Sequence, residues 1–263
     1  MHSATFRFYA NLNDFLPASA AQQRFSHAFL GNPAIKDTIE AIGPPHPEID
    51  LILVNGRSVS FNYVIQDGDC VSVYPRFSRL NISSLTKVRA PTLNRICFVL
   101  DAHLGKLARY LRMLGFDSLY RNDYVDSELA RLSALQGRVL LTQDRGLLKR
   151  NQVQHGYCVR EAQPWRQVVE VLSRFDLTDS IKPFTRCMCC NQVLKPVAAD
   201  EVRSSVPARV FQTQKRYRIC PGCRRVYWQG SHHSRMEALI ERIIDGTDMP
   251  NNHEQSIATR MDE

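Results

Sequence analysis

The sequence has 263 residues, of which 44% are hydrophobic and 23% are charged, and its formal net charge is +8. This length predicts two or three globular domains. No stretch approaches the roughly 18 to 20 uncharged apolar residues that a membrane-spanning helix needs. The N-terminus has no basic-then-apolar export signal. We therefore expect a cytoplasmic protein without a membrane partner.

Positive charge is concentrated in the last two thirds of the chain. Residues 1–78 carry 5 Lys and Arg against 7 Asp and Glu, a net charge of −2. Residues 79–179 carry 16 against 10, a net of +6, and residues 180–263 carry 13 against 9, a net of +4. A polyanion such as RNA would bind in these last two segments, although a positive surplus can also serve solubility alone.

Residues 1–78 have the pattern of a β-grasp domain. The stretch ATFRFYANL alternates as a strand does, and AIKDTIEAIG has isoleucines at helical spacing before a glycine and two prolines. IDLILVNGRSV predicts two strands joined by a turn at Asn55-Gly56, and VIQDGDCVSVYP predicts a turn and a final strand. Residues 79–94 are polar and have no period, which predicts a linker.

Two of these stretches, LILVNG and DGDCVSVYP, resemble the ubiquitin-like sulfur carriers of thiamine and molybdopterin synthesis. Those carriers end in a free Gly-Gly whose carboxylate is activated. This chain instead runs on through Arg76-Phe77-Ser78-Arg79, so that chemistry is not expected. The resemblance implies a binding or positioning role, with a protein partner as one candidate. A sulfur-transfer accessory function is a weaker alternative to the two functions given at the end of this section.

Residues 95–180 alternate strands and helices. RICFVLD, SLYR, RVLLT and GYCVR predict strands, and the first is the continuous apolar run typical of a buried parallel sheet. The segments between and after them predict helices, one with an apolar face formed by Leu104, Leu107, Ala108, Leu111 and Leu114. This order predicts an α/β domain, an open parallel sheet with helices on both faces.

Two acids follow strands of this predicted sheet. Asp101 comes directly after ICFVL, and Asp144 follows RVLLT after one residue. Ligands of open parallel sheets gather at the carboxyl ends of the strands, and two carboxylates there repel unless a cation lies between them. Oxygen ligands favour Mg²⁺ or Mn²⁺, which activate water in phosphodiester hydrolysis. Asp144 could also simply cap the next helix.

The stretch NDYVDSEL is the expected source of a third acid, Asp126 or Glu128. The competing interpretation is that Asp126 is a helix N-cap and Glu128 a first-turn acid. Basic residues accompany the acids, either as contacts to a phosphate backbone or as a solvated helix face. They are Lys106, Arg109 and Arg112 after Asp101, and Arg145 and Lys149 after Asp144.

Residues 181–245 are dominated by cysteines and predict a zinc ribbon with a closing helix from Arg235 to Ile244. Two C-x-x-C pairs, Cys187 with Cys190 and Cys220 with Cys223, make a four-thiolate set suited to structural Zn²⁺. A redox-active dithiol is the competing interpretation. Nearby aromatic residues either stack on unpaired bases or form the ribbon core; they are Tyr217, Tyr227 and Trp228. Residues 246–263 predict a disordered tail.

Five stretches together resemble, in order, the Mut-seven C-terminal RNase family. They are FVLDAHLGKLARYLRMLGFD, YRNDYVDSELA, GRVLLTQDRGLL, RCMCCN and CPGCRRVYWQGSHHSRM, within residues 96–236. That family is a PIN-like nuclease fold with an appended zinc ribbon, often preceded by a ubiquitin-like domain. The resemblance implies that Asp101, Asp126 and Asp144 are the metal-binding acids of a ribonuclease, with Glu128 sharing the role of Asp126.

The sequence therefore predicts a divalent-metal-dependent ribonuclease whose zinc ribbon helps to bind RNA. The alternative is a non-catalytic RNA-binding or ribosome-associated adaptor with a degenerate acid site.

Overall fold

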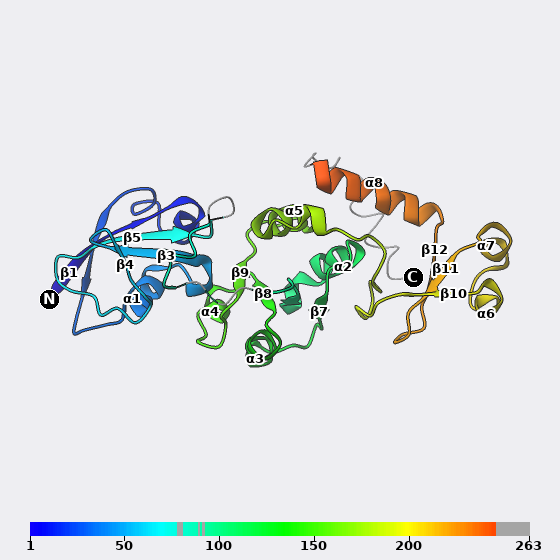
Figure 1. Ribbon diagram of the computed structural model, residues 1–263, viewed down its shortest axis with the longest axis horizontal. Coiled ribbons are helices and arrows are strands. Elements are labelled where there is room, and N and C mark those ends of the chain that lie inside the picture. The colour runs from blue at the N-terminus through cyan, green and yellow to red at the C-terminus, as the bar shows by residue number, and fades with distance from the viewer. Residues whose placement is uncertain (78–80, 89, 91–92, 246–263) are drawn as a thin grey trace. The chain divides into compact units, whose positions relative to one another are not determined.

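A computed structural model describes residues 1–77, 81–88, 90 and 93–245 (Figure 1). The predicted tail at 246–263 and part of the predicted linker lie outside these residues. The chain forms two compact units. Among the described residues, the first unit lies within residues 1–101 and 124–158, and the second within residues 102–123 and 159–245. Within the described residues, no helix is both long enough and apolar enough to cross a membrane.

The N-terminal part of the first unit is a five-stranded sheet with the order β2-β1-β5-β3-β4. Its strands are β1 (His2–Phe8), β2 (Phe25–Phe29), β3 (Ile49–Val54), β4 (Arg57–Ser58) and β5 (Cys70–Pro75). Strands β1 and β5 pair in parallel, and the other pairs are antiparallel. Helix α1 (Ile35–Ile42) lies between β2 and β3 in the chain. This arrangement confirms the predicted β-grasp fold.

Local sequence explains the hairpin of this sheet and its core. Asn55 and Gly56, between β3 and β4, have φ angles of 49° and 79°, the left-handed conformation that a tight hairpin turn requires. On α1, the helical spacing puts Ile35 and Ile39 in the core, where both are fully buried. Short 3-10 helices at Ala10–Phe15 and His46–Glu48 complete the domain.

Two features of this domain differ from the sequence analysis. Strand β2 was not predicted, and the reason lies in its edge position, where only Phe29 of its five residues is buried. Part of the predicted linker is packed within the first unit. Ile82 and Val88 are buried, and the Thr86 Oγ1 donates a 2.5 Å hydrogen bond to the Asp50 carbonyl.

The first unit also contains three parallel strands in the order β6-β8-β9. They are β6 (Phe98–Leu100), β8 (Val139–Thr142) and β9 (Gly156–Cys158), and every residue in them is buried. Helix α3 (Asp126–Gln136) packs on β6 and β8, and the short helix α4 (Arg145–Leu148) packs on β8 and β9. The predicted α/β class and its parallel sheet are confirmed.

The second unit contains helices of the predicted α/β region and the cysteine-rich segment. A 3-10 turn (Ala102–Leu104) leads into α2 (Gly105–Met113), which contacts α5 (Pro164–Phe175) and β7 (Ser118–Tyr120). A further 3-10 turn spans Thr178–Ser180. The predicted apolar face of α2 is buried throughout, at Leu104, Leu107, Ala108, Leu111 and Leu114.

The cysteine-rich segment contains an antiparallel sheet with the order β10-β11-β12. These strands are β10 (Lys195–Val197), β11 (Tyr217–Ile219) and β12 (Val226–Trp228). Helices α6 (Ala199–Val202) and α7 (Ala208–Thr213) lie between β10 and β11 in the chain and were not predicted. The closing helix α8 (Ser231–Asp245) begins four residues earlier than expected and contacts α5.

Candidate functional site

The register of β6 and β8 brings Asp101 close to Thr142. Leu100 pairs with Leu141, and the Asp101 N–H donates to the Leu141 carbonyl at 3.0 Å. The Thr142 Oγ1, on a fully buried residue, donates to Asp101 Oδ2 at 2.6 Å. The same oxygen accepts the N–H of Asp144 at 2.9 Å. One hydroxyl therefore bonds the carboxylate of Asp101 and the backbone N–H of Asp144.

Asp144 also caps the helix that follows it. It is the N-cap of α4, and its Oδ1 accepts the Gly146 N–H at 2.6 Å. The capping role considered for this residue is therefore present. A carboxylate has two oxygens, so Asp144 can cap the helix with Oδ1 and still offer Oδ2 to a metal ion.

The candidates for the third acid lie in the first turn of α3. The N-cap of that helix is Val125, so Asp126 is its first residue and not the cap. The exposed Asp126 carboxylate forms an ion pair with Arg150 at 3.5 Å, and Glu128 is partly buried two residues later. Within the described part of the chain, Asp101, Asp126 and Asp144 do not form a three-ligand metal group.

Arg145 and Lys149, predicted to contact RNA, make contacts with the β-grasp domain. The Arg145 guanidinium donates to the carbonyls of Asp14 at 3.2 Å and Phe15 at 3.4 Å, and lies 5.0 Å from the centre of the Phe15 ring. The Lys149 Nζ donates to the Glu40 carbonyl at 2.5 Å. These two cations therefore hold helix α4 against the N-terminal domain. Asp144 is the N-cap of that helix.

Further hydrogen bonds join the same two parts of the first unit. The buried Glu48 Oε1 accepts the Cys158 N–H at 2.8 Å, at the end of β9. The His46 Nε2 lies 2.7 Å from the Val153 carbonyl, and Lys36 donates to Asn151 at 2.6 Å. We call the surface formed by these contacts and those of Arg145 and Lys149 the grasp–sheet interface. Local sequence patterns do not predict this interface, because each pair of partners lies about a hundred residues or more apart in the chain.

The three basic residues of α2 differ in their surroundings. Arg112 is only 3% exposed, and its guanidinium donates to the carbonyls of Ser118 at 2.9 Å and Cys189 at 2.6 Å. Burial lowers its pKa from the ordinary value. Lys106 is exposed, and Arg109 is partly exposed. The periodicity that groups these residues does not reveal that Arg112 lies under the first cysteine knuckle.

The four predicted cysteine ligands come together. The Sγ atoms of Cys187, Cys190, Cys220 and Cys223 all lie within 4.8 Å of one another. The Cys187–Cys223 and Cys190–Cys220 sulfur distances are 3.5 and 3.2 Å. Tetrahedral Zn²⁺ with bonds of about 2.3 Å has sulfur atoms roughly 3.8 Å apart, so the cluster suits a four-thiolate metal ion. Cys189, the third cysteine of the stretch CMCC, is not part of this cluster.

Hydrogen bonds favour the thiolate at one of these cysteines. Burial acts to raise the pKa of Cys187, but bonds from the Tyr227 hydroxyl at 3.1 Å, the Cys190 N–H and Cys223 outweigh it and bring that pKa down to about 7. Burial raises the pKa of the other three thiols. A thiolate is the form that binds a metal, so Tyr227 supports the ligand role of Cys187.

Two of the three aromatic residues near the second knuckle belong to a small core. Tyr217 is buried with Val202 and Val206, and Trp228 packs against this cluster. Tyr217 and Trp228 are cross-strand partners, which puts them on one face of the ribbon sheet. The core role considered for these aromatics is therefore present.

A family model described as the Mut7-C RNAse domain matches residues 96–240, more than half of the chain. The chain belongs to the Mut7-C RNase family. A second model, Mut7-C ubiquitin, matches residues 1–81 and covers the β-grasp sheet. The Mut7-C RNase match contains the acids at 101, 126 and 144 and all four clustered cysteines.

Part of the chain also aligns with a solved structure, a putative molybdopterin converting factor subunit 1 from Pyrococcus furiosus. The alignment covers 29% of this chain and 100% of that chain, with 23% sequence identity and a TM-score of 0.24. A comparison with curated proteins found no match.

Proposed function

We propose that this Mut7-C RNase family member is a divalent-metal-dependent ribonuclease that hydrolyses RNA phosphodiester bonds. One observation carries the proposal: at the ends of adjacent parallel strands, the Thr142 hydroxyl bonds both the Asp101 carboxylate and the Asp144 backbone N–H. In open parallel sheets, ligands bind at the carboxyl ends of the strands, where these polar groups lie. The match to the Mut7-C RNAse domain supports the choice of RNA as substrate.

Asp101 and Asp144 would hold Mg²⁺ or Mn²⁺, and Asp126 or Glu128 would supply the third acid. The donor set fits, because carboxylate oxygens are among the ligands that these hard cations prefer. When bound, the ion lowers the pKa of water and neutralises charge on phosphate oxygens. Thr142 would keep the Asp101 carboxylate oriented through the hydrogen bond that its hydroxyl donates.

The basic residues would divide into two roles. Lys106 and Arg109 are the candidates for contact with the RNA backbone, as side chains with exposed surface on α2. Arg145 and Lys149 are better explained as contacts of the grasp–sheet interface, and Arg112 as support for the first knuckle.

The cysteine cluster would hold a structural zinc ion through Cys187, Cys190, Cys220 and Cys223. Two knuckles supply all four ligands and leave no coordination position for a substrate, as in structural sites. The surrounding ribbon would aid RNA binding, in keeping with the net charge of +4 over residues 180–263.

We further propose that the protein is cytoplasmic and that its domains follow the order expected from the sequence. It comprises a β-grasp domain at 1–78, a linker at 79–94, a nuclease core at 95–180, a zinc ribbon with its closing helix at 181–245 and a tail. The β-grasp domain would bind a protein partner as well as helix α4.

The test is RNA cleavage under Mn²⁺ by Asp101→Asn and Asp144→Asn proteins. Each substitution removes a charge from the acid site, and we expect cleavage to fall by about 100-fold or more. Asp37→Asn, which neutralises an exposed acid on α1, is the matched control and should cleave like the unaltered protein. Full activity of both acid variants would exclude this mechanism.

A non-catalytic RNA-binding adaptor is the second candidate. Two observations favour it: the absence of a three-ligand group among the described acids, and the ion pair between Asp126 and Arg150. An adaptor would bind RNA equally well with and without Mn²⁺ and would leave it intact. Cleavage that requires Mn²⁺ and disappears in Asp144→Asn would exclude this candidate.

A further inference from the structure

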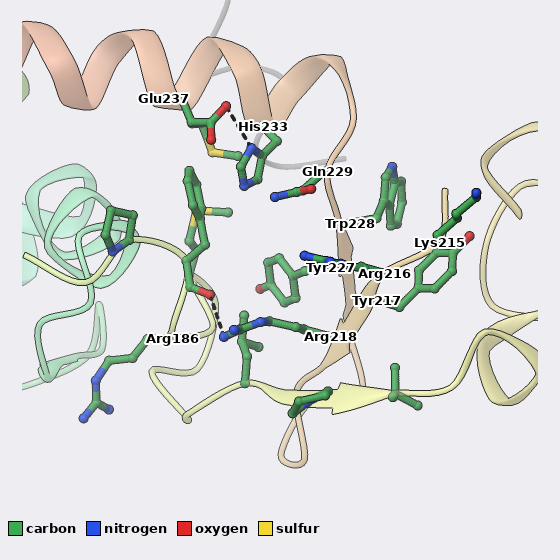
Figure 2. Close-up of a pocket in the computed structure, with 17 residues that line it drawn as sticks. Arg186, Lys215, Arg216, Tyr217, Arg218, Tyr227, Trp228, Gln229, His233 and Glu237 are labelled. Atoms are coloured by element: carbon green, nitrogen blue, oxygen red, sulfur yellow. Dashed lines mark hydrogen bonds and ion pairs between the residues drawn. The ribbon is translucent and has the colours of Figure 1, made fainter. Parts of the chain in front are cut away.

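A cavity of about 550 Å³ lies in the second unit, beside the ribbon strands and helix α8. In Figure 2, Tyr227, Arg216 and Arg218 lie between α8 and the strands of the ribbon. Cavities of roughly 300 to 1,000 Å³ are the size of small-molecule sites, so one or two nucleotides can enter this space. We call it the ribbon cavity.

The charged residues of the ribbon cavity favour an anion. Lys215, Arg216 and Arg218 line it and are all exposed, whereas Glu237 is the acidic residue among the lining side chains. A fourth cation, Arg186, is buried and paired with Asp117 at 3.1 Å, so its charge is already neutralised. Three solvated cations against one acid make the cavity mouth suited to a polyanionic backbone.

Aromatic rings form another part of the cavity wall. Arg218 and Tyr227 are cross-strand partners on β11 and β12, so a cation and an aromatic ring stand side by side on one face of the sheet. The Phe184 and His233 rings lie 4.1 Å apart, centre to centre, at an angle of 33°. Rings and cations interleaved in this way are typical of surfaces that bind single-stranded nucleic acid.

The backbone at Phe184 is strained. Its φ angle is 55°, a left-handed conformation that is costly for a large L side chain. The Phe184 N–H donates to the Met113 carbonyl at 2.9 Å, and its carbonyl accepts from Arg218 at 3.4 Å. Both bonds hold the residue in this conformation, with its ring against His233 and in the cavity lining. Strain retained in this way is common at binding sites.

We propose that the ribbon cavity binds an unpaired segment of the RNA that the enzyme cleaves. This inference rests on the proposed ribonuclease function and assigns that function a specificity for single strands. Lys215, Arg216 and Arg218 contact phosphates, and Phe184, Tyr227 and His233 offer ring surface to the bases. A duplex keeps its bases stacked inside the helix, so only an unpaired segment can place a base in the cavity.

The experiment compares a 12-nucleotide single-stranded RNA with a duplex of the same sequence. Binding is measured by fluorescence anisotropy without Mg²⁺ or Mn²⁺, so that no cleavage intervenes, at several salt concentrations. The variant is the triple substitution Lys215→Gln, Arg216→Gln and Arg218→Gln. The matched control is the triple substitution Lys195→Gln, Arg203→Gln and Arg209→Gln, at three exposed ribbon cations outside the cavity lining. Zinc content verifies that each variant retains its fold.

We expect the triple variant to bind the single strand at least about 10-fold more weakly. Its slope of log K against log salt should fall by roughly 1 to 2, since each lost contact to a single strand contributes about 0.7. Binding of the duplex and binding by the control should change little. Phe184→Leu, which leaves the charges in place, should weaken single-strand binding about 5-fold without changing the salt slope.

Unchanged single-strand binding in the triple variant, or an equal loss for single strand and duplex, would overturn the proposal. Displacement of an acidic peptide such as poly-glutamate, but not of RNA, by these substitutions would assign the cavity to a protein partner and overturn it as well. The proposed ribonuclease function fails separately, through cleavage that survives in Asp101→Asn and Asp144→Asn.

Discussion

The Thr142 hydroxyl lies 2.6 Å from the Asp101 carboxylate and donates a hydrogen bond to it. Thr142 is fully buried at the end of β8, and its oxygen also accepts the Asp144 N–H. One uncharged, buried residue thus contacts both positions, Asp101 through its carboxylate and Asp144 through its backbone.

Two substitutions of Thr142 should distinguish the contribution of its hydroxyl from that of its side-chain volume. Thr142→Val keeps the volume but removes both hydrogen bonds, and we expect the free energy of unfolding to fall by about 1 to 3 kcal/mol. RNA cleavage under Mn²⁺ should fall with it, because the Asp101 carboxylate loses its orienting donor. Thr142→Ser keeps the hydroxyl and should cleave better than Thr142→Val. Equal cleavage by the two variants would contradict the orienting role.

Removal of the Tyr227 hydroxyl should weaken metal binding by the cysteines. That hydroxyl helps to hold the pKa of Cys187 at about 7, so in Tyr227→Phe that pKa rises. At a pH above this lowered pKa, the Cys187 thiol is mostly in the thiolate form that binds metal. This advantage is lost as the pH falls through about 7. The variant should therefore release metal at a higher pH, with affinity about 10- to 100-fold lower in a competition with a chelator.

Tyr217→Phe is the matched control for that experiment. Its hydroxyl bonds the carbonyls of Val210 and Gln214 and does not contact the cysteine cluster. Metal release at the same pH in both variants would mean that the bond between Tyr227 and Cys187 does not support the site.

Arg145→Met and Lys149→Met should distinguish the sequence prediction from the contacts observed. If these cations bind RNA, their loss weakens RNA binding and lowers its salt dependence. If they hold the grasp–sheet interface, RNA binding is kept and the free energy of unfolding falls by about 1 kcal/mol for each lost set of hydrogen bonds. We expect the second result. Arg131→Met, an exposed position on α3, should change neither quantity.

Asp126→Asn and Glu128→Gln should identify the third acid. The ion pair with Arg150 is exposed, so its loss in Asp126→Asn costs less than about 1 kcal/mol of stability. A larger loss of Mn²⁺-dependent cleavage in one variant than in the other names the acid that serves the site. We expect Asp126→Asn to lose more, in agreement with the role implied by the family resemblance. Equal activity of both variants and the unaltered protein would remove α3 from the site.

Local patterns were sufficient for most of the fold. Alternation, helical spacing and the Asn55-Gly56 turn predicted the β-grasp elements, and continuous apolar runs predicted β6 and β8. The C-x-x-C pairs predicted the cysteine cluster, because the ligand spacing of a knuckle is itself a local property. Helices α6 and α7 were missed, since each is at most six residues long and has little apolar periodicity.

The roles of charged residues were harder to predict, because they depend on distant partners. Arg112 has the spacing of a surface stripe, yet it donates to Cys189, 77 residues later. Arg145 follows an acid as a phosphate-binding cation would, yet its acceptors are carbonyls 130 residues earlier. Neither partner carries a sequence signal, since any residue supplies a backbone carbonyl.

The buried bond from the Cys158 N–H to Glu48 bears on how this protein can be divided. The Mut7-C ubiquitin match ends at residue 81 and the Mut7-C RNase match begins at residue 96. These limits suggest that the chain could be divided between the two residues. A fragment that begins there would leave β9 without the Glu48 carboxylate and α4 without the carbonyls that bind Arg145 and Lys149. We expect such a fragment to be poorly soluble when produced alone and to be rescued when residues 1–95 are produced beside it as a separate chain.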